Sequence, residues 1–208
     1  MDSCHGRPVD ETETIISFNS GAKHPHFKLS NFSACPEGVL HQNIMYPSAE
    51  HAFQAYRFPQ EMRESLFSVH SDIAELSHKS FAAVGVPMKH TEKKMKYWGK
   101  KNMVGILAKM KANRLDGRKL THLECECAFV DILLAKYSKN EEHRSALLGT
   151  GDAFLLEFVR SSVANFKKRG TIERWGGMLE ERRICGHNQQ GALQMHVRSL
   201  IRGGKTSA

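Results

Sequence analysis

We expect the rest of the chain to fold around one stretch, Tyr46–Phe58, with the sequence YPSAEHAFQAYRF. It opens with a helix-start signal, because Pro47 disfavours helical geometry at Tyr46 and Ser48 is a favourable N-cap. The pattern therefore predicts a helix that begins at Ala49.

The predicted helix has two different faces. Apolar residues at helical spacing form a stripe typical of core packing. On the polar face Glu50 falls in the first turn, where the helix dipole stabilises the carboxylate and burial would destabilise it. From this stretch alone, a surface acid that favours the helix start is the preferred interpretation of Glu50, and a functional carboxylate is the alternative. The stripe comprises Ala49, Ala52, Phe53 and Tyr56, and the polar face comprises Glu50, Gln54 and Arg57.

Length and composition suit a single globular domain. The chain has 208 residues, of which 40% are hydrophobic, and this is enough for one sizeable core. Its formal net charge of +8 and its pI near 9.3 indicate an anionic partner such as a nucleotide or a nucleic acid, although many basic proteins are merely soluble.

The sequence also indicates the compartment. No apolar run approaches the length that crosses a bilayer, and the N-terminus lacks the pattern of a signal peptide. Five cysteines without a disulfide-like pattern indicate reduced thiols. We therefore expect an intracellular protein, cytoplasmic or nuclear, with no membrane association.

We expect one mainly helical α+β domain over residues 15–202, between loose tails at residues 1–14 and 203–208. Hydrophobic periodicity and turn residues predict its elements. Strands are expected at 15–18, 39–46 and 154–159, and helices from 49, at 61–84, 89–119, 120–137, from after 140 to about 148, and from about 192 to 202.

The segment Lys89–Lys119 is the most basic part of the chain, with eleven Lys and Arg residues against Glu92 and Asp116. A solvated helix also has this appearance, which is the slightly favoured interpretation for each lysine. As a group, the lysines can position phosphates.

The loop Asn19–Phe32 holds further candidates. Asn31 offers an amide for polar recognition and Phe32 a ring for stacking, although a turn residue and a core residue are the locally favoured interpretations. Neither His24 and His26 of this loop nor the group His122, Cys125 and Cys127 has a standard ligand spacing, so we expect no metal.

Three features in the second half can contribute to a site. Asp152 lies in a turn, where a capping role is the default. Trp175 adjoins Gly176 and Gly177, whose missing side chains let a ligand approach the indole. The segment 186–191, GHNQQG, opens a helix whose backbone N–H groups can hold a phosphate.

Five segments together resemble the NADAR family, also called the YbiA-like family. They occur in the family's order and extend over most of the chain, although residues 89–137 look longer than the corresponding family region. The segments are LSNF at 29–32, YPSAEHAFQAYRF at 46–58, LLGTGDAFLLE at 147–157, RWGG at 174–177 and GHNQQGALQMHVRSL at 186–200.

The resemblance implies a compact, mainly helical α+β domain with N-glycosidase activity and no cofactor. The implied substrates are ADP-ribose joined to guanine, free or on DNA or RNA, or phosphorylated riboflavin-pathway intermediates. Glu50 is then the expected acid or base, with Asp152 as a second acid. The expected substrate-binding residues are Asn31, Phe32, His51, Gln54, Trp175, Gly176, Asn188 and Gly191.

Chemical reasoning adds one candidate. If the ribose is joined to an exocyclic amine, the sugar can open to an imine, and a lysine can then capture its C1 atom as a Schiff base. Lys28, beside the LSNF segment, is the expected lysine. The competing interpretation is a non-catalytic module that binds ADP-ribose or nucleic acid through the basic segment.

Overall fold

The stretch Tyr46–Phe58 folds as expected in the computed structural model, which describes residues 7–19, 21–100, 103–158 and 174–204. Helix α1 (Ala49–Ala55) begins where predicted, and the side chain of its N-cap Ser48 accepts a hydrogen bond from the backbone N–H of His51. Both the start and the cap of this helix are therefore confirmed.

The remaining elements are mostly short. The helices that follow α1 are α2 (Gln60–Phe67), α3 (His78–Ala83), α4 (Met88–Gly99), α5 (Gly105–Arg114), α6 (His122–Lys139), α7 (Glu141–Leu148) and α9 (Gln189–Arg202), and the 3₁₀ turn η1 (His26–Leu29) precedes α1. The strands are β1 (Arg7–Pro8), β2 (Ile15–Phe18), β3 (Val39–His41), β4 (Ile44–Tyr46), β5 (Phe154–Glu157), β6 (Met178–Glu180) and β7 (Arg183–Cys185).

The strands form three small sheets. Strands β2 and β5 pair in parallel, with Ile15 opposite Phe154. Strands β1, β7 and β6 form an antiparallel sheet in that order, and β3 pairs with β4 as a hairpin. With helices predominating beside these sheets, the expected α+β class is confirmed.

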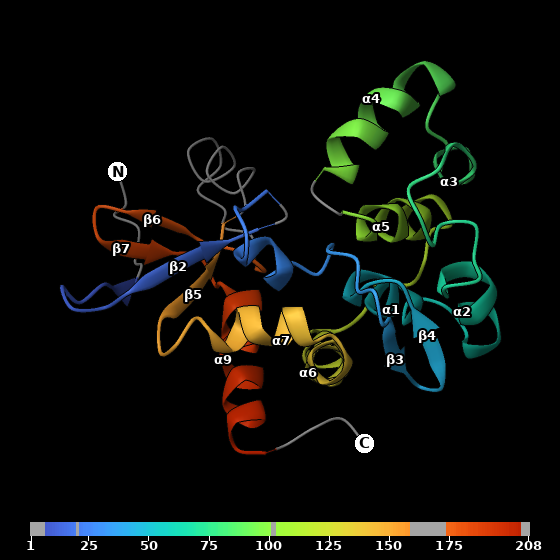
Figure 1. Ribbon diagram of the computed structural model, residues 1–208. Coiled ribbons are helices and arrows are strands. Elements are labelled where there is room, and N and C mark those ends of the chain that lie inside the picture. Colours follow the sequence, from blue (N-terminus) through green and yellow to red (C-terminus); the bar gives the residue numbers. More distant parts are fainter. Residues whose placement is uncertain (1–6, 20, 101–102, 159–173, 205–208) are drawn as a thin grey trace.

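Helix α6 joins two hydrophobic clusters. In Figure 1, α1 to α5 and the β3–β4 hairpin lie on one side of it, and the other strands and α9 lie on the opposite side. One face of α6 packs into the first cluster and the adjacent face into the second, because residues one helical turn apart share a face. The first face carries Ala128, Ile132 and Ala135, and the second carries Phe129, Leu133 and Tyr137.

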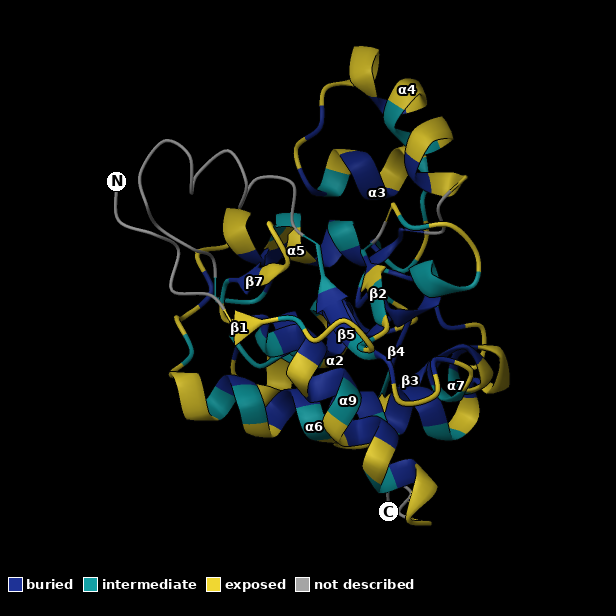
Figure 2. Ribbon diagram, turned by 90° about the vertical axis from the view of Figure 1, so that its left-hand side faces the viewer, coloured by how far each residue is buried: buried dark blue, intermediate teal, exposed yellow. Residues whose placement is uncertain are grey.

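Burial separates the elements that build the interior from those at the surface. Figure 2 shows β5 as largely buried and α4 as largely exposed. Helix α4 is anchored by Trp98, whose ring stacks on Phe81 with 5.3 Å between the centroids. The lysines of α4 that face water therefore match the solvated helix considered above.

Several expected elements have different bounds. The strand predicted at 39–46 is a hairpin, because Gln42 and Asn43 adopt φ values of 49° and 61° and turn the chain, the geometry of a type I′ turn. The helix predicted over 61–84 is two helices with an irregular segment between them. The basic segment likewise contains two helices, α4 and α5.

The N-terminal segment is not wholly loose. Arg7 and Pro8 pair with β7, and the backbone N–H of Val9 donates to Arg182. Within the described residues, pairing is therefore already present at Arg7, eight residues before Ile15.

The cysteines and the helix lengths bear on two further expectations, that the thiols are reduced and that no segment spans a membrane. Cys35, Cys125 and Cys127 are free, whereas Cys185 is disulfide-bonded, so the expectation of reduced thiols fails at that residue. Within the described ranges, every helix is too short or too polar to cross a bilayer.

Candidate functional site

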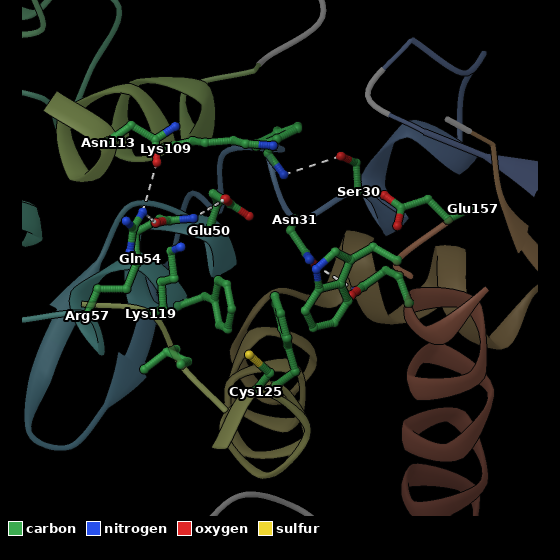
Figure 3. A pocket seen from close by; sticks show the side chains of 16 residues that line it. Ser30, Asn31, Glu50, Gln54, Arg57, Lys109, Asn113, Lys119, Cys125 and Glu157 are labelled. Atoms are coloured by element: carbon green, nitrogen blue, oxygen red, sulfur yellow. Dashed lines mark hydrogen bonds between the residues drawn. The ribbon is translucent and has the colours of Figure 1, made fainter. Parts of the chain in front are cut away.

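A cavity of about 510 Å³ opens between α1 and α5 on one side and α6, α9 and β5 on the other. Figure 3 shows the side chains that line it. The lining is mixed, with an aromatic wall, two lysines and two carboxylates. It includes Ser30, Asn31, Phe32, Glu50, Phe53, Gln54, Arg57, Lys109, Asn113, Lys119, Leu120, Cys125, Phe129, Glu157, Trp175 and Gln190.

Glu50 is the buried carboxylate of this cavity, with 7% of its surface exposed. Gln54, one turn further along α1, donates its side-chain N–H to Glu50 Oε1 at 2.8 Å. Arg57 in turn donates to the amide oxygen of Gln54 at 3.0 Å. Because that oxygen is occupied by a cation, the NH₂ group of Gln54 must face Glu50. The polar face predicted for α1 is thus a directed hydrogen-bond chain.

Arg57 is itself held by the last turn of α5 and by the segment that follows this helix. Its guanidinium donates to Asn113 Oδ1 at 2.9 Å, to the carbonyl of Gly117 at 2.8 Å and to that of Arg118 at 3.2 Å. With its donors engaged in this way, Arg57 orients Gln54 rather than offering a free positive charge to a ligand.

The electrostatic environment makes Glu50 easier to protonate than an ordinary glutamate. Burial raises the pKa of Glu50. The charge of Lys109, the hydrogen bond from Gln54 and the charge of Arg57 lower this pKa, but their effect is smaller. A carboxyl group with a raised pKa inside a cleft is typical of a general acid or base. The burial of Glu50 also disfavours its interpretation as a surface acid.

Three rings form the aromatic wall. Phe53 of α1 stacks on Phe129 of α6 with centroids 4.0 Å apart. Trp175 meets Phe129 edge-on at 5.1 Å and Phe53 at 6.0 Å. Such a surface suits the apolar face of a flat base.

Asn31 and Phe32 reach the cavity from the segment after η1. The backbone N–H of Glu50 donates to the carbonyl of Asn31 at 3.0 Å, and that of Gly105 donates to Phe32 at 3.1 Å. The amide oxygen of Asn31 accepts a bond of 3.0 Å from Gln190. A Cβ atom at Gly105 would lie 2.8 Å from the Cα of Phe32, so glycine is required for α5 to approach this closely.

Lys109 and Lys119 line the cavity and belong to the basic segment. Lys109 also approaches the ring of Phe32, with its Nζ atom 5.9 Å from the centroid. The sequence singled out the segment as phosphate-binding but favoured a solvated role for each lysine. Only the folded chain shows which of the lysines adjoin the cavity.

Glu157 is a second carboxylate that sequence reasoning missed. It ends β5, which pairs in parallel with β2, and its side chain lines the cavity. An acid at the carboxyl end of an otherwise apolar strand was the available signal, because ligand sites often gather at the ends of parallel strands.

Two residues expected to be catalytic lie outside the cavity lining. Lys28 forms an ion pair with Glu142 of α7. Asp152 pairs with Arg202 at 2.6 Å, and its side chain is 96% exposed. The Lys28 ammonium and the Asp152 carboxylate are therefore paired with other side chains away from the cavity. The structure does not bring either residue to Glu50.

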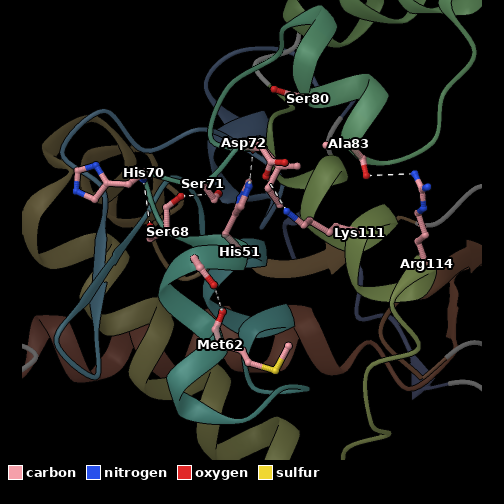
Figure 4. A network of polar contacts seen from close by, with 12 residues as sticks. His51, Met62, Ser68, His70, Ser71, Asp72, Ser80, Ala83, Lys111 and Arg114 are labelled. Carbon is pink, nitrogen blue, oxygen red and sulfur yellow. Dashed lines mark hydrogen bonds and ion pairs between the residues drawn. The ribbon is translucent and has the colours of Figure 1, made fainter.

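His51 points away from the cavity into the interior. Its Nε2 atom donates to the carbonyl of Ile73 at 3.0 Å, and its Nδ1 atom lies 2.8 Å from the hydroxyl of Ser48. Burial lowers its pKa to about 4. In Figure 4, His51 lies beside the ion pair of Lys111 with Asp72, in a network that joins α1, α5 and the segment before α3.

Asn188, Gly176 and Gly191 support the cavity wall without lining it. Asn188 pairs its amide with the backbone of β5, accepting from the N–H of Glu157 at 2.9 Å and donating to Leu155 at 2.8 Å. A Cβ atom at Gly191 would lie 2.1 Å from the carbonyl of Leu155. These residues therefore fix the end of β5 that carries Glu157.

The start of α9 is not open to a phosphate as its sequence suggested. The backbone N–H groups of Asn188, Gln189 and Gln190 donate to the carbonyls of Gly176, Arg174 and Trp175, respectively. These bonds fix the segment that carries Trp175, because the expected phosphate donors are already used.

One solved structure gives an independent comparison. The NMR structure of the E. coli protein YbiA superposes with a TM-score of 0.52 and 21% sequence identity, covering 95% of this chain and 90% of that chain. The fold is thus YbiA-like, as the sequence resemblance implied. No family model matches the chain, and no curated protein matches it.

Proposed function

We propose that this chain is an N-glycosidase that hydrolyses the bond between ribose C1 and a base nitrogen in ADP-ribosylated guanine. The observation that carries this proposal is a buried carboxylate, Glu50, with a raised pKa, in a cavity that an aromatic wall and two lysines also line. The similarity in fold to YbiA supports the family to which the sequence motifs point.

The aromatic rings and the two lysines of the lining suit the two parts of such a substrate. A guanine ring would lie on Trp175 and the neighbouring phenylalanines, as stacking is favourable for any flat base. The pyrophosphate would lie at Lys109 and Lys119, which supply positive charge at the cavity edge. The ribose, which joins these two parts, would then lie at Glu50.

Glu50 would act first as an acid and then as a base. It gives its proton to the base nitrogen as the bond to C1 breaks, and positive charge develops on the sugar. A water molecule adds its hydroxyl to C1, and its second proton returns to the Glu50 carboxylate. Glu157 would orient that water or a ribose hydroxyl, the task expected of Asp152.

A lysine route remains part of the proposal. If the sugar opens to an imine, an amine can displace guanine at C1 and form a Schiff base that water then hydrolyses. Lys109 lines the cavity, whereas Lys28 is paired with Glu142. Borohydride trapping followed by peptide mapping tests both residues: an adduct on Lys109 supports this route, an adduct on Lys28 restores the earlier expectation, and no adduct removes the route.

The test of the function itself is a comparison of substrates. Purified protein is incubated with ADP-ribosylated guanosine, and separately with phosphorylated riboflavin-pathway intermediates, and products are identified by mass spectrometry. We expect release of ADP-ribose and guanosine from the first substrate. Turnover of only the second would contradict the assigned substrate, and tight binding of ADP-ribose without any product would contradict the assigned reaction.

A further inference from the structure

Lys136 of α6 is a buried cation that the proposed reaction does not use. None of its surface is exposed. Its Nζ atom donates to the carbonyl of Lys28 at 2.7 Å, to the carbonyl of Ser30 at 3.0 Å and to the hydroxyl of Ser33 at 3.4 Å. Among the described residues, no carboxylate forms an ion pair with it.

Burying an ammonium without a carboxylate is costly, so its retention calls for a geometric reason. An ammonium has three N–H donors on one atom, and no neutral side chain has that geometry. Here three oxygens of one short segment converge on it. Lys136 therefore suits this segment better than an apolar residue that would leave the oxygens unpaired.

The same segment is bonded to the four helices that border the cavity. Its successive carbonyls, from Lys28 to Phe32, each accept from another helix. Lys136 of α6 donates to the carbonyls of Lys28 and Ser30, and Gln194 of α9 donates to that of Leu29 at 2.8 Å. The backbone N–H groups of Glu50 in α1 and Gly105 in α5 donate to the carbonyls of Asn31 and Phe32, respectively. Displacement of the segment would thus move Ser30, Asn31 and Phe32 relative to Glu50.

We propose that Lys136 is a positioning residue, whose ammonium clamps residues 28–33 so that Asn31 and Phe32 keep their places beside Glu50. This inference rests on the proposed function for its effect on turnover. Its effect on the geometry of the segment does not depend on any reaction.

The hydrogen bonds from Lys136 to residues 28–33 should weaken at alkaline pH. Burial lowers the pKa of Lys136 to about 8, and the neutral amine keeps only two of its three donors. Other groups around it do not share this transition: burial lowers the pKa of His143 to about 3, and burial raises the pKa of the Cys35 thiol and of the Tyr137 hydroxyl. Lys28, whose carbonyl is an acceptor, directs its own ammonium to Glu142.

The test compares Lys136→Met with Lys139→Met, which removes an exposed lysine from the same helix. In folded Lys136→Met, we expect kcat/KM to fall by about 10- to 100-fold, and the loss of wild-type activity above about pH 8 to disappear. The backbone amides of Glu50 and Gly105 should also exchange hydrogen faster. The Lys139→Met variant should match the wild type in all three.

A folded Lys136→Met variant with wild-type exchange at both amides and wild-type kcat/KM would overturn the inference. If that variant does not fold, the wild type decides, because the NMR shifts of the Glu50 and Gly105 amides should titrate with a midpoint near 8; flat shifts would overturn it. A wild type inactive on every substrate would refute the proposed function, while the amide measurements would still decide the role of Lys136.

Discussion

Replacing Glu50 by Gln tests the centre of the site, because the substitution keeps the shape of the side chain and removes its charge and its proton. A positioned carboxylate contributes roughly 10²- to 10⁴-fold to a rate by proton transfer. This corresponds to about 2.7–5.4 kcal/mol of transition-state stabilisation. We expect kcat to fall by that factor, and binding of ADP-ribose to persist because the aromatic rings and the lysines of the cavity are unchanged.

The stability of the same variant separates the two interpretations of Glu50. In the folded wild type, burial raises the pKa of Glu50, so the folded state holds the proton to higher pH than the unfolded state does. Stability is therefore lost as pH rises from the unfolded pKa through the folded one. Each pKa unit of that shift corresponds to about 1.4 kcal/mol that Glu50→Gln recovers at high pH. If Glu50 only stabilised a helix start, neutralising it would instead lower the free energy of unfolding by about 0.3–1 kcal/mol.

The assays are steady-state turnover and urea unfolding between pH 4 and pH 8. The matched control is Glu61→Gln, which neutralises an exposed first-turn acid of α2. We expect the control to keep its turnover, and Glu50→Gln to equal or exceed wild-type stability at pH 8 with the difference shrinking towards pH 4. Near-normal turnover, or a loss of stability at pH 8 like that of the control, would refute the reasoning.

Three further substitutions test the walls and the excluded acid. Trp175→Ala should weaken the binding of a guanosine-containing ligand by about 1–3 kcal/mol in calorimetry, as expected for the loss of one stacking contact. The control Tyr97→Ala, on exposed α4, should leave the affinity unchanged, and equal affinities of the two variants would contradict stacking of the base on Trp175. Lys109→Met should weaken ADP-ribose binding and reduce its salt dependence. The control Lys93→Met should leave both unchanged, since Lys93 is exposed on α4 outside the cavity lining. Equal effects of the two substitutions would assign binding to the general charge of the basic segment. Asp152→Asn should keep turnover within about twofold, because Asp152 lies outside the cavity lining and its exposed ion pair contributes at most about 1 kcal/mol to stability. A loss greater than tenfold in a folded variant would return Asp152 to the site.

The local pattern of the sequence determined the core helix and its polar face. Pro47 and Ser48 place the start of α1 by short-range sterics and capping, and i, i+4 spacing places Gln54 beside Glu50. The same kind of reasoning located β2, α7 and the end of α9, each of which depends on residues a few positions apart.

What the tertiary structure decided was which polar groups meet. Asp152 and Glu157 lie five residues apart in one motif, yet pairing with Arg202 holds the first at the surface, and the end of β5 carries the second into the cavity. Likewise, Lys28 adjoins the LSNF segment in sequence, whereas Lys109 reaches the cavity from a helix that begins at Gly105. Contacts between residues far apart in the chain depend on how helices and strands pack, and no local spacing encodes them.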